Sequence, residues 1–219
     1  MSARLEITDH IAVLNLGDDE NRFSPDWLKT TNGYLDRIES GEAKALVTTG
    51  SGKFYSNGLD LDWLAAHSDQ ADWYVDQVQQ LLARVLVAPV PTVAAINGHA
   101  FGAGSMLGIA HDFRVMRVDR GYYCFPEVDI HIPFTPGMAA LIQAKLTPAA
   151  AVEAMTTGRR YGGADAEEIG LVTATAPEGK VTATAVDLVA SLKGKDPGTL
   201  QAIKSTMFAG VTAALCGQG

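Results

Sequence analysis

One stretch of this chain constrains its fold more than any other, because it joins a strand to a helix through small residues. Residues 91–112 read PTVAAINGHAFGAGSMLGIAHD. The residues at 92–96 predict a strand, and the glycine-rich turn at 102–104 leads into an apolar helical pattern over 106–110. The first N–H groups of a helix lack helical partners and lie at the positive end of its dipole. This turn is therefore suited to holding a developing negative charge.

A second glycine loop precedes this stretch. Residues 53–61 read KFYSNGLDL, with Gly58 directly before Leu59. Two backbone donors from separate loops can converge on one oxygen, as an oxyanion hole requires. Glycine in either loop alone more often serves only the backbone geometry of a turn. A dinucleotide site is rejected, because Leu107 stands where the third glycine of GxGxxG belongs.

The motifs and their order resemble those of a known family. Residues 54–60 fit FxxxGxD, residues 91–104 read PTVAAINGHAFGAG, and residues 125–130 read FPEVDI. In these motifs the chain is similar to the crotonase superfamily of enoyl-CoA hydratases and isomerases. It especially resembles the short plant-type Δ3,Δ2-enoyl-CoA isomerases, which share HDxxxMRxDRG at 111–121. The resemblance extends from about residue 5 to the C-terminus.

The resemblance implies an α/β fold, a crotonase-like spiral of ββα turns with a helical C-terminal region, assembled as a homotrimer or a dimer of trimers. Strands that alternate with helices agree with such a layered structure. We expect strands at 5–7, 11–16, 45–49, 92–96 and 113–116, a helix at 72–88, and helices after Ser24, Thr147 and Asp196. We assign residues 1–146 to the spiral core with the oxyanion loops and the catalytic glutamate, and residues 147–219 to a helical region for oligomerisation and pocket closure.

The resemblance also implies the catalytic groups. The N–H groups of Leu59 and Ala103 would hold the thioester oxygen of an acyl-CoA as it becomes an enolate, and Glu127 would be the acid–base residue. The segment around Glu127 is apolar, and burial raises the pKa of a carboxyl group, which suits a residue that takes and returns a proton. Asp129 and His131 are alternative bases, because an extended segment would point all three side chains the same way.

Met106 separates the reactions of this family. In the hydratases that the chain resembles, a second glutamate stands at this position and helps to hold water, whereas a thioether cannot donate or accept a proton usefully. Dienoyl-CoA isomerases have an aspartate there and a further acid where this chain has Thr135. We therefore expect an isomerase that moves a 3-enoyl-CoA double bond to the 2-position. The alternatives are another crotonase reaction, namely hydration or thioester hydrolysis, and a catalytically silent CoA-ester binding protein.

The resemblance also implies that coenzyme A lies near the segment 22–24 before the first helix and along the first glycine loop at 55–61. Arg22 or Lys53 would meet a phosphate of coenzyme A, and the acyl tail would pass Leu61, Trp63, Leu64 and Phe134. The full set of expected substrate-binding residues is Arg22, Phe23, Ser24, Lys53, Tyr55, Asn57, Gly58, Leu61, Gly102, Met106 and Phe134. No metal and no separate cofactor are expected, since coenzyme A arrives as part of the substrate.

Composition excludes several other classes of protein. The 219 residues carry a net charge of −8 with no basic cluster, which argues against nucleic acid as a partner. No apolar run reaches membrane-spanning length, and the chain begins without a signal core. Two cysteines are too few for a disulfide framework. Because the chain also ends without a peroxisomal tripeptide, we expect a cytoplasmic protein.

Overall fold

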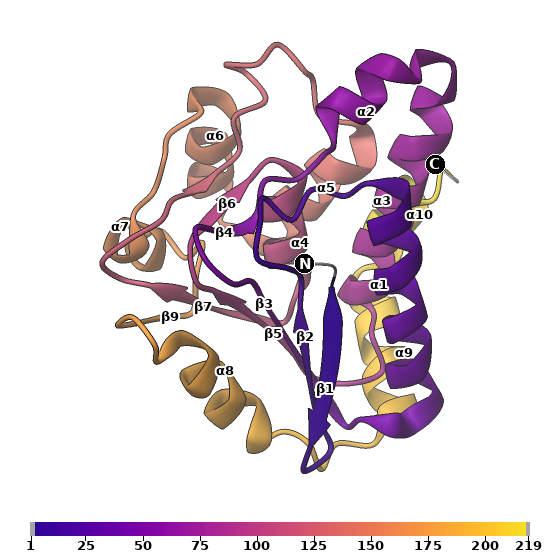
Figure 1. The fold of residues 1–219 in the computed structure, drawn as a ribbon, viewed down its shortest axis with the longest axis vertical. Helices are drawn as coiled ribbons and strands as arrows, with labels where there is room; N and C mark the ends of the chain where they lie inside the picture. Colours follow the sequence, from indigo (N-terminus) through magenta and orange to yellow (C-terminus); the bar gives the residue numbers. More distant parts are fainter. Residues whose placement is uncertain (1–2, 218–219) are drawn as a thin grey trace.

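The computed structural model describes residues 3–217, and a six-stranded sheet forms its centre (Figure 1). The sheet order is β1 (Arg4–Thr8), β2 (Ile11–Asn15), β3 (Ala45–Thr49), β5 (Thr92–Ile96), β7 (Phe113–Arg117) and β9 (Ala174–Ala176). β1 pairs antiparallel with β2, and the following pairs are parallel. Residues 1–2 of the expected core region 1–146 lie outside the described residues. So do residues 218–219 of the expected region 147–219, which are also the last two residues of the C-terminal tripeptide.

A second, smaller sheet holds the short strands β4 (Phe54–Ser56), β6 (His99–Phe101) and β8 (Tyr123–Cys124), all parallel. Each successive turn of the chain contributes one strand to the large sheet and the next strand to the small one, as the pairs β3–β4, β5–β6 and β7–β8 show. A helix follows each pair, so the expected spiral of ββα turns is confirmed. The small strands were not predicted, because two or three residues are too few for a visible alternation.

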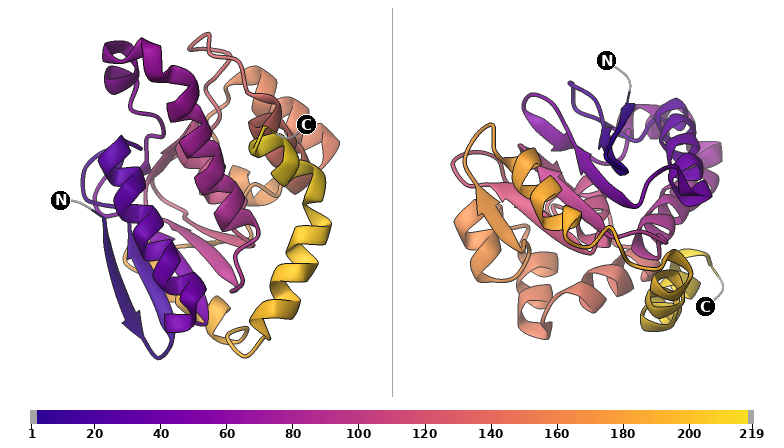
Figure 2. Two further views of the ribbon diagram at one scale, coloured as in Figure 1. Left: turned by 90° about the vertical axis from the view of Figure 1, so that its right-hand side faces the viewer. Right: turned by 90° about the horizontal axis from the view of Figure 1, so that it is seen from below.

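The alternation of side chains across the large sheet divides the core. Val93 and Ala95 of β5 pack in a cluster with helix α8 (Val181–Ala190), whereas Ala94 and Ile96 belong to the larger cluster on the opposite face. Both clusters are almost free of solvent, so β5 is buried on both sides, as is usual for a central parallel strand. Figures 1 and 2 show α8 alone beneath one face and the other long helices on the far side.

The remaining helices complete the ββα turns and the C-terminal region. They are α1 (Pro25–Arg37), α2 (Leu61–Ala66), α3 (Ala71–Leu86), α4 (Ala103–Ala110), α5 (Pro136–Lys145), α6 (Pro148–Thr157), α7 (Gly163–Glu168), α9 (Pro197–Met207) and α10 (Ala209–Leu215), with a π turn at Ile38–Glu42 and a 3-10 turn at Ser68–Gln70. The expected strands at 11–16, 45–49 and 113–116 and the helix at 72–88 are confirmed to within two residues. The C-terminal region is mainly helical, but its strand β9 extends the large sheet beside β7.

The three predicted helix starts are confirmed by their caps. Ser24 and Thr147 each accept a hydrogen bond from the backbone N–H three residues on, both at 3.3 Å, and Asp196 accepts one at 2.8 Å. A proline follows each cap at the first helical position, where its missing N–H is not needed. Local chemistry alone thus fixes where these helices begin.

Helix α9 carries two exposed large apolar side chains, Ile203 at 51% and Met207 at 67% exposure. Between residues 3 and 217 no helix combines the length and the apolar composition that crossing a bilayer would need.

Candidate active site

The first glycine loop is held from both sides, so the N–H of Leu59 has a fixed direction. The carbonyl of Gly58 accepts from the N–H of Phe23 at 2.8 Å, and the hydroxyl of Tyr74 accepts from the N–H of Asp60 at 2.8 Å. The same hydroxyl donates to the carbonyl of Phe23 at 2.9 Å. These bonds tie the loop to the segment before α1 and to α3, which lie far away in sequence.

The second glycine loop starts helix α4 three residues earlier than expected, at Ala103. Its N-cap is Gly102, with φ 53° and ψ −124°, a conformation that essentially only glycine adopts. The N–H of Gly102 donates to the carbonyl of Cys124 at 3.1 Å, and the N–H of Met106 donates to the carbonyl of Gly102 at 3.0 Å. The hydroxyl of Ser105 donates to the Ala100 carbonyl at 2.6 Å. The helix start is therefore rigidly joined to the small sheet.

The two loops meet at Gly58, which has a φ of 77°. A Cβ atom at this position would lie 2.8 Å from the backbone N of Ala103 and 2.8 Å from the backbone O of Phe101. Such distances require movement of the backbone, so the loops pack this closely only because the residue is glycine. Among the hydrogen bonds of residues 3–217, neither the N–H of Leu59 nor that of Ala103 donates to a protein acceptor. Both donors remain available at the point where the loops converge.

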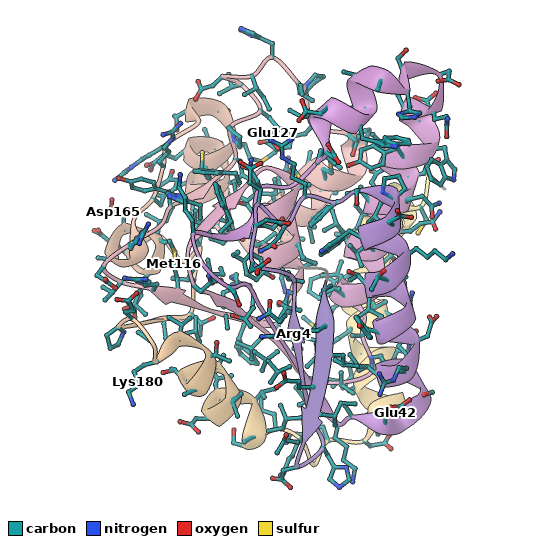
Figure 3. All side chains as sticks on the ribbon, viewed as in Figure 1. Arg4, Glu42, Met116, Glu127, Asp165 and Lys180 are labelled. Atoms are coloured by element: carbon teal, nitrogen blue, oxygen red, sulfur yellow. The ribbon has the colours of Figure 1, made fainter. Side chains whose placement is uncertain are left out.

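Glu127 lies beside this pair of loops. Its side chain is 8% exposed, and a Cβ atom at Gly102 would lie 3.4 Å from its Oε1. Its Oε2 is buried and has no hydrogen-bond partner among the described residues. Burial raises the pKa of this carboxyl to about 7, only partly offset by a backbone hydrogen bond. Figure 3 shows Glu127 at the upper end of the molecule, away from Glu42 and Lys180.

The segment around Glu127 is a turn, which corrects the extended conformation expected from the sequence. The N–H groups of Asp129 and Ile130 both donate to the carbonyl of Pro126, at 2.9 and 3.1 Å. Asp129 and His131 are exposed, while Glu127 points inward. The three side chains therefore do not share one direction, and of the three Glu127 alone combines burial with a position beside the two glycine loops. Proline at the start of the segment and the left-handed His131, at φ 58°, favour this turn.

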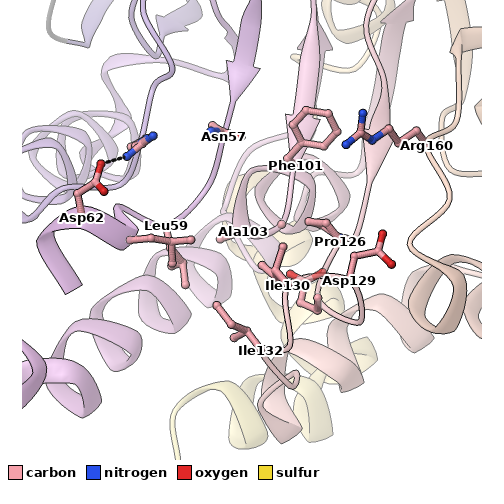
Figure 4. A pocket seen from close by; sticks show the side chains of 14 residues that line it. Asn57, Leu59, Asp62, Phe101, Ala103, Pro126, Asp129, Ile130, Ile132 and Arg160 are labelled. Carbon is pink, nitrogen blue, oxygen red and sulfur yellow. Dashed lines mark hydrogen bonds and ion pairs between the residues drawn. The ribbon is translucent and has the colours of Figure 1, made fainter. Parts of the chain in front are cut away.

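A cavity of about 480 Å³ opens between these elements (Figure 4). The expected residues that line it are Arg22, Asn57, Leu59, Leu61, Gly102, Ala103 and Glu127. These seven residues come from four separate parts of the chain, at 22, 57–61, 102–103 and 127, and they surround one opening. No three or more His, Cys, Asp or Glu side chains within residues 3–217 are grouped to hold a metal ion.

The other expected contact residues lie outside the cavity lining. Phe23 and Tyr55 are fully buried, Phe23 stacked on Trp27 and Tyr55 bonded to Thr48 at 2.8 Å, and Met106 is 1% exposed in the core. These large side chains serve packing.

The remaining expected contact residues have other roles. Ser24 caps α1, Gly58 acts through its missing side chain, Lys53 lies over the ring of Phe54, and Phe134 packs against Phe125. Of the residues expected along the acyl tail, Trp63 and Leu64 pack against the core and are absent from the lining.

Six lining residues were not expected at the site, namely Asp62, Phe101, Pro126, Ile130, Ile132 and Arg160. Asp129, which was expected as an alternative base, also lines the cavity. Those at 126–132 follow directly from the position of Glu127, because a turn places its neighbours around the same opening. Arg160 comes from the loop between α6 and α7, and no local pattern links that loop to residues about sixty positions earlier. The pairing of Tyr161 with Tyr123 brings it to the site.

Comparison with known proteins identifies the family. Residues 6–218 match the enoyl-CoA hydratase/isomerase family. Enoyl-CoA delta isomerase 3 of Arabidopsis thaliana is 39% identical over 202 residues, which cover 87% of this chain and 84% of that protein. Enoyl-CoA delta isomerase 2, peroxisomal, of the same plant is 37% identical over 193 residues, covering 82% and 80%.

A solved structure agrees with this result. The apo structure of an enoyl-CoA isomerase of Mycobacterium tuberculosis is similar with a TM-score of 0.91 at 25% identity, covering 99% of this chain and 95% of that chain. The chain therefore belongs to the enoyl-CoA hydratase/isomerase family and has the crotonase fold.

Proposed function

We propose that this protein is an acyl-CoA isomerase that converts a 3-enoyl-CoA into a 2-enoyl-CoA. The observation that carries the proposal is a single buried carboxyl, Glu127, beside two unpaired N–H groups from converging loops. The relatives named as enoyl-CoA delta isomerases support the same reaction class. The reaction needs no cofactor or metal besides the coenzyme A of the substrate.

The first step is removal of a proton from C2 of the substrate by the ionised Glu127. The electrons move toward the thioester carbonyl and form a dienolate, whose negative oxygen accepts hydrogen bonds from the N–H groups of Leu59 and Ala103. These donors are fixed before the substrate binds, so no reorganisation is needed when charge develops. A carboxyl with a pKa of about 7 is matched to this transfer near neutral pH.

The second step returns the same proton to C4. The dienolate carries negative charge at C2, C4 and oxygen, so protonation at C4 moves the double bond to the 2-position and regenerates the ionised Glu127. One carboxyl can perform both transfers, because C2 and C4 lie on either side of a single carbon atom. No atom is gained or lost by the substrate.

Hydration would require a second group to position water. Met106 stands where the hydratases described above have a glutamate, and it is buried in the core rather than exposed to the cavity. Asp129 also lines the cavity, but Figure 4 shows its carboxylate on the side of Arg160, away from Ala103. The geometry therefore favours isomerisation over hydration.

The decisive experiment follows the formation of conjugated 2-enoyl thioester from 3-enoyl-CoA in the ultraviolet, with Glu127→Gln and Asp129→Asn in parallel. We expect Glu127→Gln to lose about a hundredfold to ten-thousandfold in kcat, and Asp129→Asn to keep turnover within roughly tenfold. Absence of turnover for short, medium and long tails with acyl-CoA binding intact would favour a silent binding protein. Hydration of 2-enoyl-CoA that depends on Glu127 would favour a hydratase.

We also propose that the chain forms a homotrimer or a dimer of trimers through its helical C-terminal region, 147–219. The exposed apolar side chains Ile203 and Met207 of α9 support association, because such surface is stabilised by contact with a partner. Sedimentation analysis would test the assembly, and a monomer at micromolar concentration would refute it. The cytoplasmic location stays a prediction, and two relatives are named as peroxisomal.

A further inference from the structure

A second cavity, of about 470 Å³, opens beside helix α9 and shares no lining residue with the candidate active site. Its lining includes Pro91 and Asp112, which directly precede β5 and β7, so it lies at the amino ends of these parallel strands. The glycine loop at 102–104 follows the carboxyl end of β5. Figures 1 and 3 accordingly show α9 low in the molecule and Glu127 near its top. The second cavity is therefore separate from the proposed catalytic centre.

The wall of this second cavity is mainly apolar. Its large apolar side chains come from β7, from the connection between α8 and α9, and from α9 and its end; they are Phe113, Leu192, Leu200, Ile203, Met207 and Phe208. Ile203 and Met207, proposed above for subunit contact, are exposed at its outer edge, whereas Phe208 is buried. A cavity of this size, with apolar walls and a few polar groups, is typical of a site for a small organic molecule.

The carboxylate of Asp112 in this lining is already engaged. Lys204 is 4% exposed, and its Nζ donates to Oδ2 of Asp112 at 2.6 Å and to the carbonyl of Val90 at 2.9 Å. The same Oδ2 accepts a hydrogen bond from the N–H of Thr92 at 2.9 Å. Asp112 thus neutralises Lys204.

Two further cations lie close to this pair without a carboxylate of their own. Arg114 is 7% exposed and donates to the carbonyls of Leu171 and His111, at 2.6 and 3.1 Å. Lys145 lines the cavity, and its Nζ lies 5.0 Å from the centre of the Phe208 ring. Within residues 3–217, no ion pair or hydrogen bond joins Lys145 to another side chain or to a carbonyl. Three cations therefore surround one carboxylate, which leaves two positive charges in excess.

The local structure holds the ammonium of Lys145 without neutralising it. Lys145 stands in the last turn of α5, where the helix dipole favours a cation, and the ring of Phe208 attracts it as well. Neither feature supplies a negative charge, and a charge removed from water is costly without a partner. The other charged groups of the lining are Lys195 and Asp196, and Asp196 is engaged in capping α9. The cavity thus presents an unpaired ammonium next to an apolar wall.

We propose that this second cavity binds an unesterified fatty acid, with its carboxylate on Lys145 and its hydrocarbon chain along the apolar wall. An inorganic anion would leave the apolar wall in contact with water, and a neutral hydrocarbon would leave the ammonium unpaired. A carboxylate on a hydrocarbon chain satisfies both. The inference goes beyond the proposed isomerisation and does not depend on Glu127.

The test measures the binding of decanoate, decanol and propionate by calorimetry to the wild type, to Lys145→Gln and to Lys29→Gln. Lys29 is exposed on α1, so its variant is the control for the loss of one positive charge. We expect Lys145→Gln to weaken decanoate binding roughly ten- to thirtyfold, because a hydrogen-bonded charge pair is lost. Decanol should bind more weakly than decanoate and be unaffected by Lys145→Gln, and propionate should bind much more weakly than decanoate. Lys29→Gln should behave as the wild type.

The pH dependence of binding is a second readout. Burial lowers the pKa of Lys145 to about 8, Arg114 and Lys204 lower it as well, and Asp112 opposes them. A carboxylate binds the protonated form, so the affinity for decanoate should fall as pH rises from 7 to 9.5. Near pH 8 binding should take up protons, which makes the measured heat depend on the buffer. Lys145→Gln should lose this proton uptake.

Several results would overturn the inference. They are an absence of decanoate binding, an equal affinity for decanol and decanoate, and an affinity for decanoate that Lys145→Gln leaves unchanged. Decanoate that 3-enoyl-CoA displaces from the wild type and from Lys145→Gln alike would lie in the active site instead. A subunit contact at Ile203 and Met207 that seals the cavity would abolish binding. Failure of the proposed isomerase reaction would leave the inference intact, because no measurement in this test uses turnover.

Discussion

The two walls of the cavity are built by different means. One wall consists of the loops around Gly58 and Gly102, where backbone atoms do the work and side chains are excluded by contacts as short as 2.8 Å for an added Cβ. The other wall is the turn at 126–132, where one buried side chain, Glu127, lies among exposed neighbours. The first wall supplies fixed dipoles, and the second supplies a group that titrates.

This difference determines which property of each wall a substitution can change. Backbone donors keep their strength whatever side chain they carry, so the proposed oxyanion hole in the wall formed by the glycine loops depends on geometry and would be lost if the loops separated. The carboxyl wall depends on its surroundings, because burial sets its pKa at about 7. Substitutions in the first wall should therefore change the positions of the two N–H donors. Substitutions in the second wall should change the pH dependence of activity and stability.

After the loss of the Glu127 carboxyl itself, the largest effect is expected when the loops are pushed apart. Gly58→Ala introduces a Cβ 2.8 Å from the N of Ala103 at a φ of 77°, so the two donors can no longer converge. We expect kcat to fall about a hundredfold to a thousandfold, as for the loss of an oxyanion donor. The control is Gly33→Ala in α1, where nothing lies within 4 Å of the added atom, and we expect it to stabilise the fold by about 0.5–1 kcal/mol. Equal activity in the two variants would refute the role of the Gly58 contact.

The second effect concerns the stability of the fold. Well below pH 4.5 Glu127 is protonated in both the folded and unfolded states. As pH rises from 4.5 to about 7 the carboxyl ionises first in the unfolded state, so the stability of the fold falls until the folded carboxyl, whose pKa is about 7, ionises as well. Glu127→Gln removes this ionisation. We expect the variant to be more stable than the wild type at pH 8–9 by up to about 3 kcal/mol and to match it near pH 4.5. Chemical denaturation of both proteins across this range measures the difference, and a difference independent of pH would contradict the buried carboxyl.

The third effect is the pH dependence of the reaction. Glu127 must be ionised to take the first proton, so activity should rise with pH through about 7 and reach a plateau above it. We expect kcat/KM at pH 5.5 to be roughly thirtyfold below the plateau. Initial rates over the stable pH range measure the profile. A rate independent of pH between 5.5 and 8 would show that a different group takes the proton.

The smallest effect is expected for the side chain of a backbone donor. Leu59→Ala keeps the N–H in place, because the bonds of Gly58 and Asp60 hold the loop on both sides. We expect kcat to change by less than about threefold, and KM to rise modestly because Leu59 also lines the cavity. Steady-state kinetics separate the two parameters. A large loss in kcat would mean that the side chain, not the backbone, supports the reaction.

The sequence predicted the elements whose chemistry is local. The capped starts of α1, α6 and α9, the large-sheet strands and both glycine loops follow from residues close together in the chain. The turn at 126–132 was predicted as extended, because its geometry depends on hydrogen bonds to the Pro126 carbonyl that no periodicity reveals. Phe23 and Tyr55 were expected at the ligand but lie in the core, since large aromatic side chains suit either place equally well.

Arg160 illustrates what sequence patterns leave out. Its place in the cavity depends on a bridge between Tyr161 and Tyr123 and on the ring of Phe101, all of them distant in sequence. The neighbouring Arg159 has the same charge and local sequence, yet it pairs with acids of its own region. Only the folded chain distinguishes the two arginines.

In the proposed reaction one carboxyl moves one proton from C2 to C4 beneath a backbone oxyanion hole. The most direct test supplies 3-enoyl-CoA deuterated at C2 and locates the label in the early product by NMR. We expect deuterium at C4 in the wild type and loss of turnover in Glu127→Gln. Turnover that persists in Glu127→Gln, with C4 protonated only from solvent, would contradict it.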